Sequence, residues 1–360
     1  MSVVVVADPD VWMESGALRQ LESIDRYPGV ELTVGLPDLH GGRSPVGFAA
    51  AARGHVYPYL IGGDVGCGMA LFQTALPLRK FRAEKFEKIL SALESLDDEE
   101  LDPDLERQAA EEADGRPAGF GSLGGGNHFA ELQKIERVDD AAALAALGVE
   151  PDRVLMLVHT GSRGVGPAVL AAFNRETGYA ADEPEAELYL ERHDRALSWA
   201  ALNRQAVARR LMSAAGLKSD LRPLLDSPHN FVERRGEVFV HRKGAVSSLR
   251  GPVVLPGSRG SWSYLLKPDP DSAAAAFSLS HGAGRKWARS TCRERLGQKA
   301  DKAALSRTAL GGRVVCRDVE LLRQETPEAY KNVDTVLASL VSRSLASVTA
   351  VLRPLLTYKG

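Results

Sequence analysis

Histidines at the ends of short apolar runs are the clearest chemical signal in this sequence. Six of its eight histidines lie in or beside turns rich in glycine, serine or asparagine: His40, His128, His159, His229, His241 and His281. Turns on a rigid scaffold are where ligands and catalytic groups converge, and imidazole is the commonest metal ligand. The pattern therefore predicts a site built from several loop histidines. His193, inside a helical pattern, and His55 are instead expected to be half-exposed structural residues.

The segment IGGDVGCGM (residues 61–69) adds a carboxylate and a thiol to this set. Asp64 and Cys67 lie three residues apart in a stretch too rich in glycine for a stable helix, so a tight turn can point both at one ion. Oxygen, nitrogen and sulfur ligands together suit a borderline metal such as Mn, Fe, Co or Zn better than Mg or Ca. The alternative for Cys67 is a buried, inert thiol.

Four turns of small residues indicate phosphate binding. GSRG occurs at 161–164 and 257–260, GSLGGGNH at 121–128 and SHGAGR at 280–285. Consecutive backbone N–H groups in such turns form concavities that bind anions. Arg285, Arg289 and Arg293 follow at four-residue spacing, and on a helix they would share one face. The turns and arginines favour a polyphosphate or a nucleic-acid end as ligand, and a solvated helix face is the alternative for the arginines.

One histidine is a candidate nucleophile. A neutral imidazole can attack phosphorus, and two metals held by Asp64, Cys67 and three histidines would leave a further histidine free. His281 is the best placed by composition, because it lies among glycines and beside arginines that could stabilise phosphate oxygens. The residues alone do not distinguish it from His40.

The bulk composition is that of an ordinary soluble globular protein. The chain has 360 residues, of which 44% are hydrophobic and 26% charged. A formal net charge of −2 argues against a polybasic protein held to nucleic acid by bulk charge, but leaves room for a local basic cleft. No apolar run is long enough for a membrane span, and MSVVVVADPD reads as a first strand. Three widely spaced cysteines favour the reducing cytoplasm.

The candidate residues follow elements that the apolar pattern predicts. ELTVGLPDLHGG, VLMLVHTGSRG, EVFVHRKGA and GPVVLPGSRG read as strands that end in turns. Apolar residues at spacings of three and four predict helices over 81–96 and 185–216, the second ending at Gly216. Residues 97–116 read as an acidic surface connection, and 166–184 carry little signal. Similar turns from residue 37 to 284, with no linker, favour one interwoven α+β domain.

The motifs and their order resemble those of the RtcB-type RNA ligases. They are GLPDLHGG, IGGDVGCGM, GSLGGGNHFAE, VHTGSRG, SPHNF, HRKGA, PGSRGSWSY, SHGAGR and the closing AYKNVDTV…RPLLTYKG. The match runs from about residue 35 to the C-terminus and is weakest over 75–118 and 166–225. The resemblance implies a single catalytic domain over residues 1–360, with mixed β-sheets surrounded by helices and an active site in a central cleft.

The resemblance also implies an activity. The family's enzymes use GTP and manganese to join RNA that ends in a 3′-phosphate or 2′,3′-cyclic phosphate to RNA that begins with a 5′-hydroxyl, in RNA repair or tRNA splicing. The histidine of SHGAGR, here His281, attacks the α-phosphate of GTP and becomes a histidine–GMP adduct. GMP then passes to the RNA 3′-phosphate, and the 5′-hydroxyl attacks that activated end and expels GMP. A cyclic phosphate is first opened by hydrolysis.

Ligands carry over residue by residue. Cys67 would bridge two Mn²⁺ ions; Asp64 and His128 would complete one ion, and His159 and His229 the other. Phe129 would stack on guanine, and Glu131 would read its edge. The GTP-binding residues implied are Asn127, His128, Phe129, Ala130, Glu131, His229, Asn230, Pro256, Gly257, Ser258, Arg259, Ser263, His281, Gly282, Ala283, Gly284, Tyr330 and Lys359.

The chain departs from the family's common members in three ways. It is shorter, it carries Arg259 and Trp262 where less bulky residues are usual, and KWARS follows SHGAGR in place of the usual serine–arginine continuation. The short form is similar to a subgroup linked to a release-factor homologue and to repair of damaged RNA, so a release-factor-like or activating protein partner is a further expectation. Two other functions stay open: a two-metal phosphoesterase acting on RNA cyclic-phosphate ends, and a non-catalytic paralogue that binds RNA ends.

Overall fold

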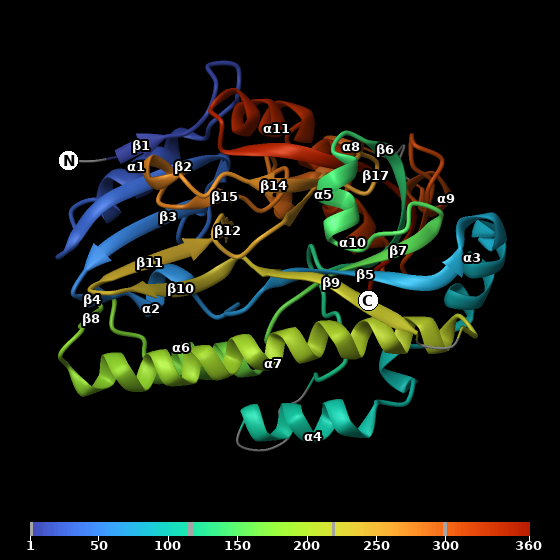
Figure 1. Ribbon diagram of the computed structural model, residues 1–360, viewed down its shortest axis with the longest axis horizontal. Helices are drawn as coiled ribbons and strands as arrows, with labels where there is room; N and C mark the ends of the chain where they lie inside the picture. The colour runs from blue at the N-terminus through green and yellow to red at the C-terminus, as the bar shows by residue number, and fades with distance from the viewer. Residues whose placement is uncertain (1–2, 114–118, 218–219, 298–300) are drawn as a thin grey trace.

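Two mixed β-sheets with helices on both sides form the framework of the protein (Figure 1). The computed structural model describes residues 3–113, 119–217, 220–297 and 301–360. The long helix α7 (Pro184–Ala214) runs beneath the sheets, and α11 (Val333–Ser342) lies above them. The predicted α+β class, with mixed sheets surrounded by helices, is confirmed.

The five-stranded sheet has the order β1-β2-β3-β11-β10, with β1 parallel to β2 and the other pairs antiparallel. Its strands are β1 (Val3–Val5), β2 (Val30–His40), β3 (Val46–Arg53), β10 (Asn230–Arg235) and β11 (Val238–Lys243). The predicted first strand and the strands in ELTVGLPDLHGG and EVFVHRKGA are therefore confirmed. The end of β2 carries Asp38 and His40 to the edge of this sheet.

The second large sheet has the order β13-β14-β17-β6-β7-β5-β9, with β16 also paired to β17. Its strands are β5 (Gly68–Pro77), β6 (Phe129–Val138), β7 (Arg153–Thr160), β9 (Leu221–Pro228), β13 (Val253–Pro256), β14 (Ser263–Pro268), β16 (Arg313–Val315) and β17 (Ala346–Tyr358). The strands in VLMLVHTGSRG and GPVVLPGSRG are β7 and β13, as predicted. Two-stranded pairs join β4 (His55–Val56) to β8 (Tyr179–Ala180) and β12 (Ala245–Ser247) to β15 (Ser278–Ser280).

The register of the second sheet brings distant motifs to one end. Gly68, at the start of β5, lies opposite Thr160 at the end of β7 and opposite Pro228 at the end of β9. Phe129, at the start of β6, lies opposite His159. Antiparallel neighbours alternate in direction, so a strand start meets its neighbours' ends. The turns that precede β5 and β6 and the turns that follow β7 and β9 therefore lie together at one end of this sheet.

The helices are α1 (Ser15–Ile24), α2 (Pro58–Ile61), α3 (Ala83–Ala92), α4 (Pro103–Glu112), α5 (Ala141–Ala146), α6 (Val165–Ala172), α7, α8 (Cys292–Leu296), α9 (Lys302–Leu305), α10 (Val319–Gln324) and α11. Helices α3 and α7 confirm those predicted over 81–96 and 185–216. Gly216 follows α7 with φ 70°, the left-handed conformation that ends a helix. None of the helices in the described ranges has the length and apolar character to cross a membrane.

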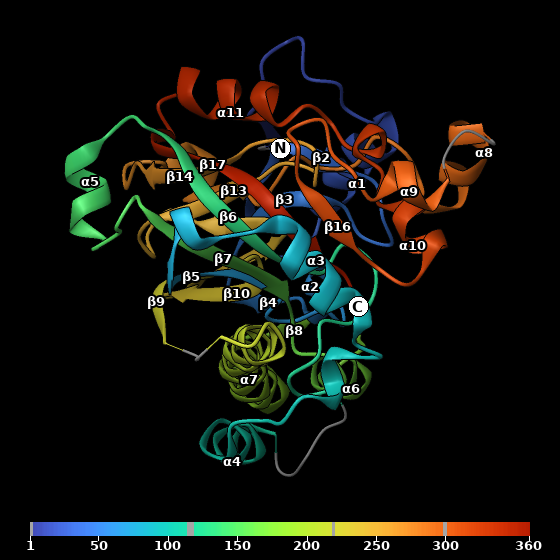
Figure 2. The same cartoon turned by 90° about the vertical axis from the view of Figure 1, so that its right-hand side faces the viewer.

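One expectation about the surface is wrong. The acidic stretch 97–116 contains α4, which packs beneath α7 (Figure 2), rather than only a solvated connection. The Asp102 side chain accepts the N–H groups of Asp104 and Leu105 and so caps α4, whose Leu105 is buried. Residues 114–118 lie outside the described residues. Residues 166–184, where the sequence carries little signal, contain most of α6 and the strand β8.

His193 is buried rather than half-exposed. Its Nε2 accepts the N–H of Val232 at 2.9 Å, which ties α7 to β10. The amphipathic pattern placed this residue on a helix but did not show that β10 of the five-stranded sheet packs against it.

Candidate active site

A cleft of about 830 Å³ is lined by the ends of strands from both large sheets. It gathers most of the predicted site residues, which come from eight separate segments of the chain. Those that line it are Asp64, Cys67, Asn127, Phe129, Glu131, His159, His229, Asn230, Pro256, Gly257, Ser258, Arg259, His281, Gly282, Ala283, Gly284, Tyr330 and Lys359. His128, Ala130 and Ser263 lie just behind its wall and are buried.

The turn before β5 presents Asp64 and Cys67 together. The N–H of Cys67 donates to the carbonyl of Asp64 at 3.1 Å, and Gly66 between them has φ 73°. A Cβ at Gly66 would lie 2.9 Å from the Ala200 Cβ of α7, so the turn requires glycine for both its conformation and its packing. Asp64 remains exposed to the cleft, whereas Cys67 is buried.

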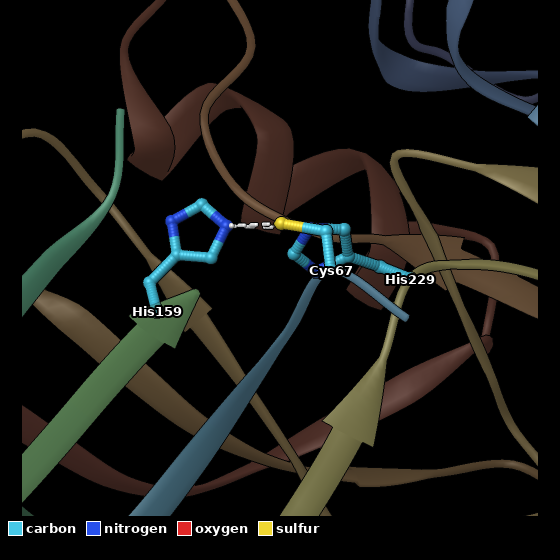
Figure 3. Close-up of side chains that lie close together, drawn as sticks. All are labelled: Cys67, His159 and His229. Atoms are coloured by element: carbon cyan, nitrogen blue, oxygen red, sulfur yellow. Dashed lines mark hydrogen bonds between the residues drawn. The ribbon is translucent and has the colours of Figure 1, made fainter. Parts of the chain in front are cut away.

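Cys67 belongs to two groups of side chains that could each hold a metal ion. Its thiol and ring nitrogens of His159 and His229 lie within 4.8 Å of one another. The second group joins the same thiol to Asp64 and His128 within the same limit. Figure 3 shows the first group, with the side chains converging from the start of β5, the end of β7 and the end of β9. The Sγ of Cys67 is 3.2 Å from His159 Nε2 and 3.3 Å from His128 Nε2.

Hydrogen bonds behind the imidazoles leave their Nε2 atoms free to act as ligands. His128 Nδ1 donates to the carbonyl of Leu123 at 2.9 Å, and His159 Nδ1 donates to that of Asn127 at 3.3 Å. A carbonyl only accepts, so the proton sits on Nδ1 and the Nε2 lone pair faces Cys67. The buried His229 Nδ1 has no partner among the described residues.

The electrostatics of the cluster also suit a metal. Burial, followed by the charge of neighbouring imidazoles, holds the pKa values of His159 and His229 well below the ordinary value, so both rings are neutral. Burial would raise the pKa of Asp64, but the interaction with His128, whose Nε2 lies 3.7 Å from Asp64 Oδ2, lowers it to about 2. Burial and Asp64 raise the pKa of the Cys67 thiol. Converging neutral imidazoles, a carboxylate and a thiol are a donor set that fits a borderline divalent ion.

Three of the six loop histidines, His40, His241 and His281, are not members of this cluster. His241 lies within β11 and is buried; its Nε2 accepts the N–H of Tyr57 at 2.9 Å, so it is structural. His40 lines the cleft, where its Nδ1 donates to the carbonyl of Asp38 at 2.9 Å. Burial lowers the pKa of His40 to about 4. The structure thus brings His128, His159 and His229 into the cluster and leaves the other loop histidines outside it.

His281 is oriented by a carboxylate that the sequence reasoning missed. Its Nδ1 donates to Oδ2 of the fully buried Asp38 at 2.6 Å, and its backbone N–H donates to the same oxygen at 3.2 Å. The His281 ring centroid is 4.8 Å from that of His229, so the metal cluster and this pair adjoin. The sequence did carry a signal for Asp38, because this acidic residue stands inside the apolar run ELTVGLPDL. A carboxylate buried with such a strand needs a polar partner.

Two further contacts hold Asp38 against His281. A Cβ at Gly284, which has φ 72°, would lie 2.2 Å from the carbonyl oxygen of Asp38, so only glycine allows the SHGAG turn to come this close. Lys331 donates its Nζ to the carbonyls of Pro37 at 3.0 Å and Leu39 at 2.7 Å, on either side of Asp38. Its backbone N–H also donates to the carbonyl of Gly284 at 2.9 Å.

Phe129 and Glu131 form a further part of the cleft wall. Phe129 is partly exposed there, and the carboxylate of Glu131 accepts from Thr357 Oγ1 at 2.5 Å and from Gln133 Nε2 at 2.7 Å. Gln133 also donates to Ser263, which places that serine behind Glu131. Lys359 Nζ donates to the carbonyl of His128 at 3.0 Å, so the penultimate residue is part of the cleft wall.

The arginines after SHGAG do not form the predicted helical stripe. Arg285 pairs with Tyr330 in a β-bridge, the N–H groups of Lys286 and Trp287 donate to the carbonyl of Ala329, and α8 begins only at Cys292. These backbone bonds hold 285–287 against 329–330 and exclude a helix there. Arg285 instead donates to the buried Glu325 at 3.0 Å, a second carboxylate that the sequence reasoning missed.

Arg259 is turned partly away from the cleft. Its Nη1 donates to the carbonyls of Glu325 at 2.7 Å and Leu322 at 3.1 Å, at the end of α10. The side-chain amide of Asn230 likewise bonds to backbone groups: it donates to the carbonyl of Asp64 and accepts the N–H of Gly244. Both residues line the cleft while holding neighbouring segments in place.

Comparison with known proteins places the chain in a family. The family described as tRNA-splicing ligase RtcB matches residues 20–116 and 97–360. The RNA-splicing ligase RtcB2 of Escherichia coli is 42% identical over 371 residues, covering 100% of this chain and 96% of the relative. The RNA-splicing ligase RtcB of Mycobacterium bovis is 32% identical over 67% of this chain and 65% of its own length. The tRNA-splicing ligase RtcB of Methanococcus maripaludis is 25% identical over 97% of this chain and 92% of its own length. The chain therefore belongs to the RtcB family.

Proposed function

We propose that this protein is a GTP- and manganese-dependent RNA ligase that joins 3′-phosphate or 2′,3′-cyclic phosphate ends to 5′-hydroxyl ends. The observation that carries the proposal is the pairing of His281 with Asp38 directly beside a cluster in which one thiol serves two groups of metal ligands. Cys67 would bridge the two ions, with Asp64 and His128 on one and His159 and His229 on the other. Manganese there would supply Lewis-acid activation of a bound phosphate.

The chain's own residues would guide the covalent steps. Asp38 holds the Nδ1 proton of His281, so the Nε2 lone pair is free to attack the α-phosphorus of GTP. The new N–P bond forms as the bond to pyrophosphate breaks. The GMP group then moves to the RNA 3′-phosphate, which regenerates the imidazole. Attack by the 5′-hydroxyl forms the phosphodiester and releases GMP.

Glu131 gives the proposal a pH dependence. Burial raises the pKa of Glu131 to about 7, although hydrogen bonds from Thr357 and Gln133 act in the opposite direction. The ionised carboxylate would accept the N–H groups on the guanine edge, and protonation removes that acceptor. We expect the affinity for guanosine, which has no titratable phosphate, to fall about tenfold from pH 8 to pH 6. Calorimetric titration would measure this.

Glu131→Gln is the matched variant for that experiment. It keeps the shape of the side chain but has no ionisable group, so it should bind guanosine more weakly at pH 8 and with no change down to pH 6. An equal pH slope in both proteins would mean that another group titrates, and the assignment of Glu131 to guanine would then be wrong.

An RNA-joining assay tests the function itself. Purified protein would receive Mn²⁺, GTP and two RNAs, one with a 2′,3′-cyclic phosphate and one with a 5′-hydroxyl. A joined product that needs both GTP and Mn²⁺ is expected. Opening of the cyclic phosphate without joining would instead identify a phosphoesterase, and RNA binding with neither reaction would identify a non-catalytic paralogue. Either result contradicts the proposal.

The setting of the activity belongs to the same proposal. We place the enzyme in the cytoplasm, where its three free cysteines would stay reduced. It would act as one catalytic domain over residues 1–360, on RNA ends produced by splicing or damage, with a release-factor-like or activating protein as partner.

A further inference from the structure

We propose that one rim of the cleft binds single-stranded RNA, with Trp12 and Trp287 stacking on bases that flank the ends to be joined. The inference rests on the proposed function and deepens it by naming residues that would hold the RNA strand. The tryptophan rim is defined by Trp12, Lys286, Trp287, Arg289 and Lys331. All but Lys331 line the cleft.

Trp12 is an exposed indole supported by a fixed cation. It precedes α1, lines the cleft and is 51% exposed, which is unusual for so large an apolar side chain. The Nζ of Lys331 lies 5.8 Å from the centre of its ring. That ammonium donates to the carbonyls of Pro37 and Leu39, so contacts within the chain fix its position.

Trp287 repeats this arrangement on the neighbouring segment. It is half-buried, and its ring centre lies 5.9 Å from Lys286 Nζ and 5.3 Å from Arg295 Cζ. Its N–H donates to the carbonyl of Ala329 at 3.2 Å, only two residues before Lys331. Trp12 and Trp287 therefore contact the same short stretch, 329–331, one through Lys331 and the other through Ala329.

The charge of the rim suits a polyanion. Lys286 and Arg289 are exposed, and within the described part of the chain Arg289 forms one ion pair, with Glu325 at 3.4 Å. This local excess of positive charge contrasts with the net charge of −2 for the chain. Proteins that bind single-stranded nucleic acid combine cations along the backbone with aromatic rings under the bases. A duplex would hide its base faces, and an acidic peptide would make no use of the indoles.

The rim is linked directly to the proposed nucleophile. Lys331 fixes the residues on either side of Asp38, and Asp38 bonds to His281 at 2.6 Å. A strand stacked on the tryptophans would thus lead toward the site where its end reacts. The KW pair of KWARS, a departure from the usual family sequence, then contributes an indole and a cation to RNA binding.

Fluorescence anisotropy with a short, labelled single-stranded RNA bearing a 3′-phosphate, without GTP, tests the proposal. Trp12→Ala and Trp287→Ala should each weaken binding roughly 5- to 150-fold, the loss expected for one stacked base. Trp12→Phe and Trp287→Phe should retain most of the affinity. Leu188→Ala is the control, because Leu188 is 43% exposed on α7 and does not line the cleft, and it should bind as the unmodified protein does.

An RNA with abasic nucleotides next to its 3′ end makes the test specific for stacking. This RNA should bind the unmodified protein more weakly than normal RNA does. Its affinity for the two alanine variants should equal its affinity for the unmodified protein. Unchanged binding of normal RNA in both alanine variants, equal losses for normal and abasic RNA, or equally tight binding of polyglutamate would overturn the proposal. Failure of the proposed function is read separately, as absence of RNA joining by the unmodified protein.

Discussion

Replacing Cys67 with alanine is expected to abolish binding of both metal ions at once. The thiol is the one ligand shared by the group with His159 and His229 and the group with Asp64 and His128. Asp64→Ala, in contrast, should weaken one ion and spare the other. Elemental analysis of protein equilibrated with Mn²⁺ and then desalted would give the number of ions bound by each variant. Since no metal would remain to activate GTP, the Cys67 variant should also form no GMP adduct.

Cys316→Ala is the matched control for this experiment. Cys316 is also buried, but its Sγ donates to the carbonyl of Asp318 and belongs to neither metal group, so metal content should not change. Metal binding should also depend on pH, because burial raises the pKa of the Cys67 thiol and the ion must displace its proton. Affinity should rise about tenfold per pH unit for each proton released. Two ions retained by Cys67→Ala would contradict the bridging role.

Replacing Asp38 with asparagine is expected to slow formation of the GMP adduct by about 10²- to 10⁴-fold, the range for groups that set the tautomer of a catalytic imidazole. Asparagine has nearly the same shape, but its amide can donate to Nδ1 of His281 and so favour a proton on Nε2. The attacking lone pair would then be lost. Rapid-quench measurement of labelling by GTP gives the rate, and equilibrium binding of guanosine gives the affinity.

The split between rate and affinity separates positioning from a general structural defect. In Asp38→Asn, guanosine affinity and Mn²⁺ content should stay near those of the unmodified protein, because Asp38 contacts neither Glu131 nor the metal cluster. A variant that labels at the normal rate would show that His281 needs no carboxylate to orient it. Loss of metal and guanosine binding together with rate would make Asp38 a structural residue.

The strands and their turns could be predicted because periodicity is local. The apolar runs that became β2, β7, β11 and β13 each end in a glycine-rich turn, and that signal lies within about a dozen residues. Helix α4 was missed because its sequence is polar on all but one narrow side, and only packing against α7 shows that side to be buried.

The site was predictable in its residue types but not in its pairings. His241 and His159 both lie near the end of a strand, but the Nε2 of His241 accepts the N–H of Tyr57, a contact that the turn residues around it do not show. Asp38 and His281 are 243 residues apart, so their contact depends on how β2 meets the SHGAG turn. Glu325 was missed for the same reason. Arg285 donates to it and pairs with Tyr330 in a β-bridge, so Arg285 is not part of the helix that simple spacing predicts.

The most direct test of the account is covalent labelling of the protein by GTP. Protein loaded with Mn²⁺ would be incubated with α-labelled GTP and no RNA, denatured, and digested for mass spectrometry. The account predicts one GMP per chain on His281, stable to alkali, labile to acid and absent from His281→Ala. Absence of label in protein that holds both ions, or label that persists in His281→Ala, would contradict it.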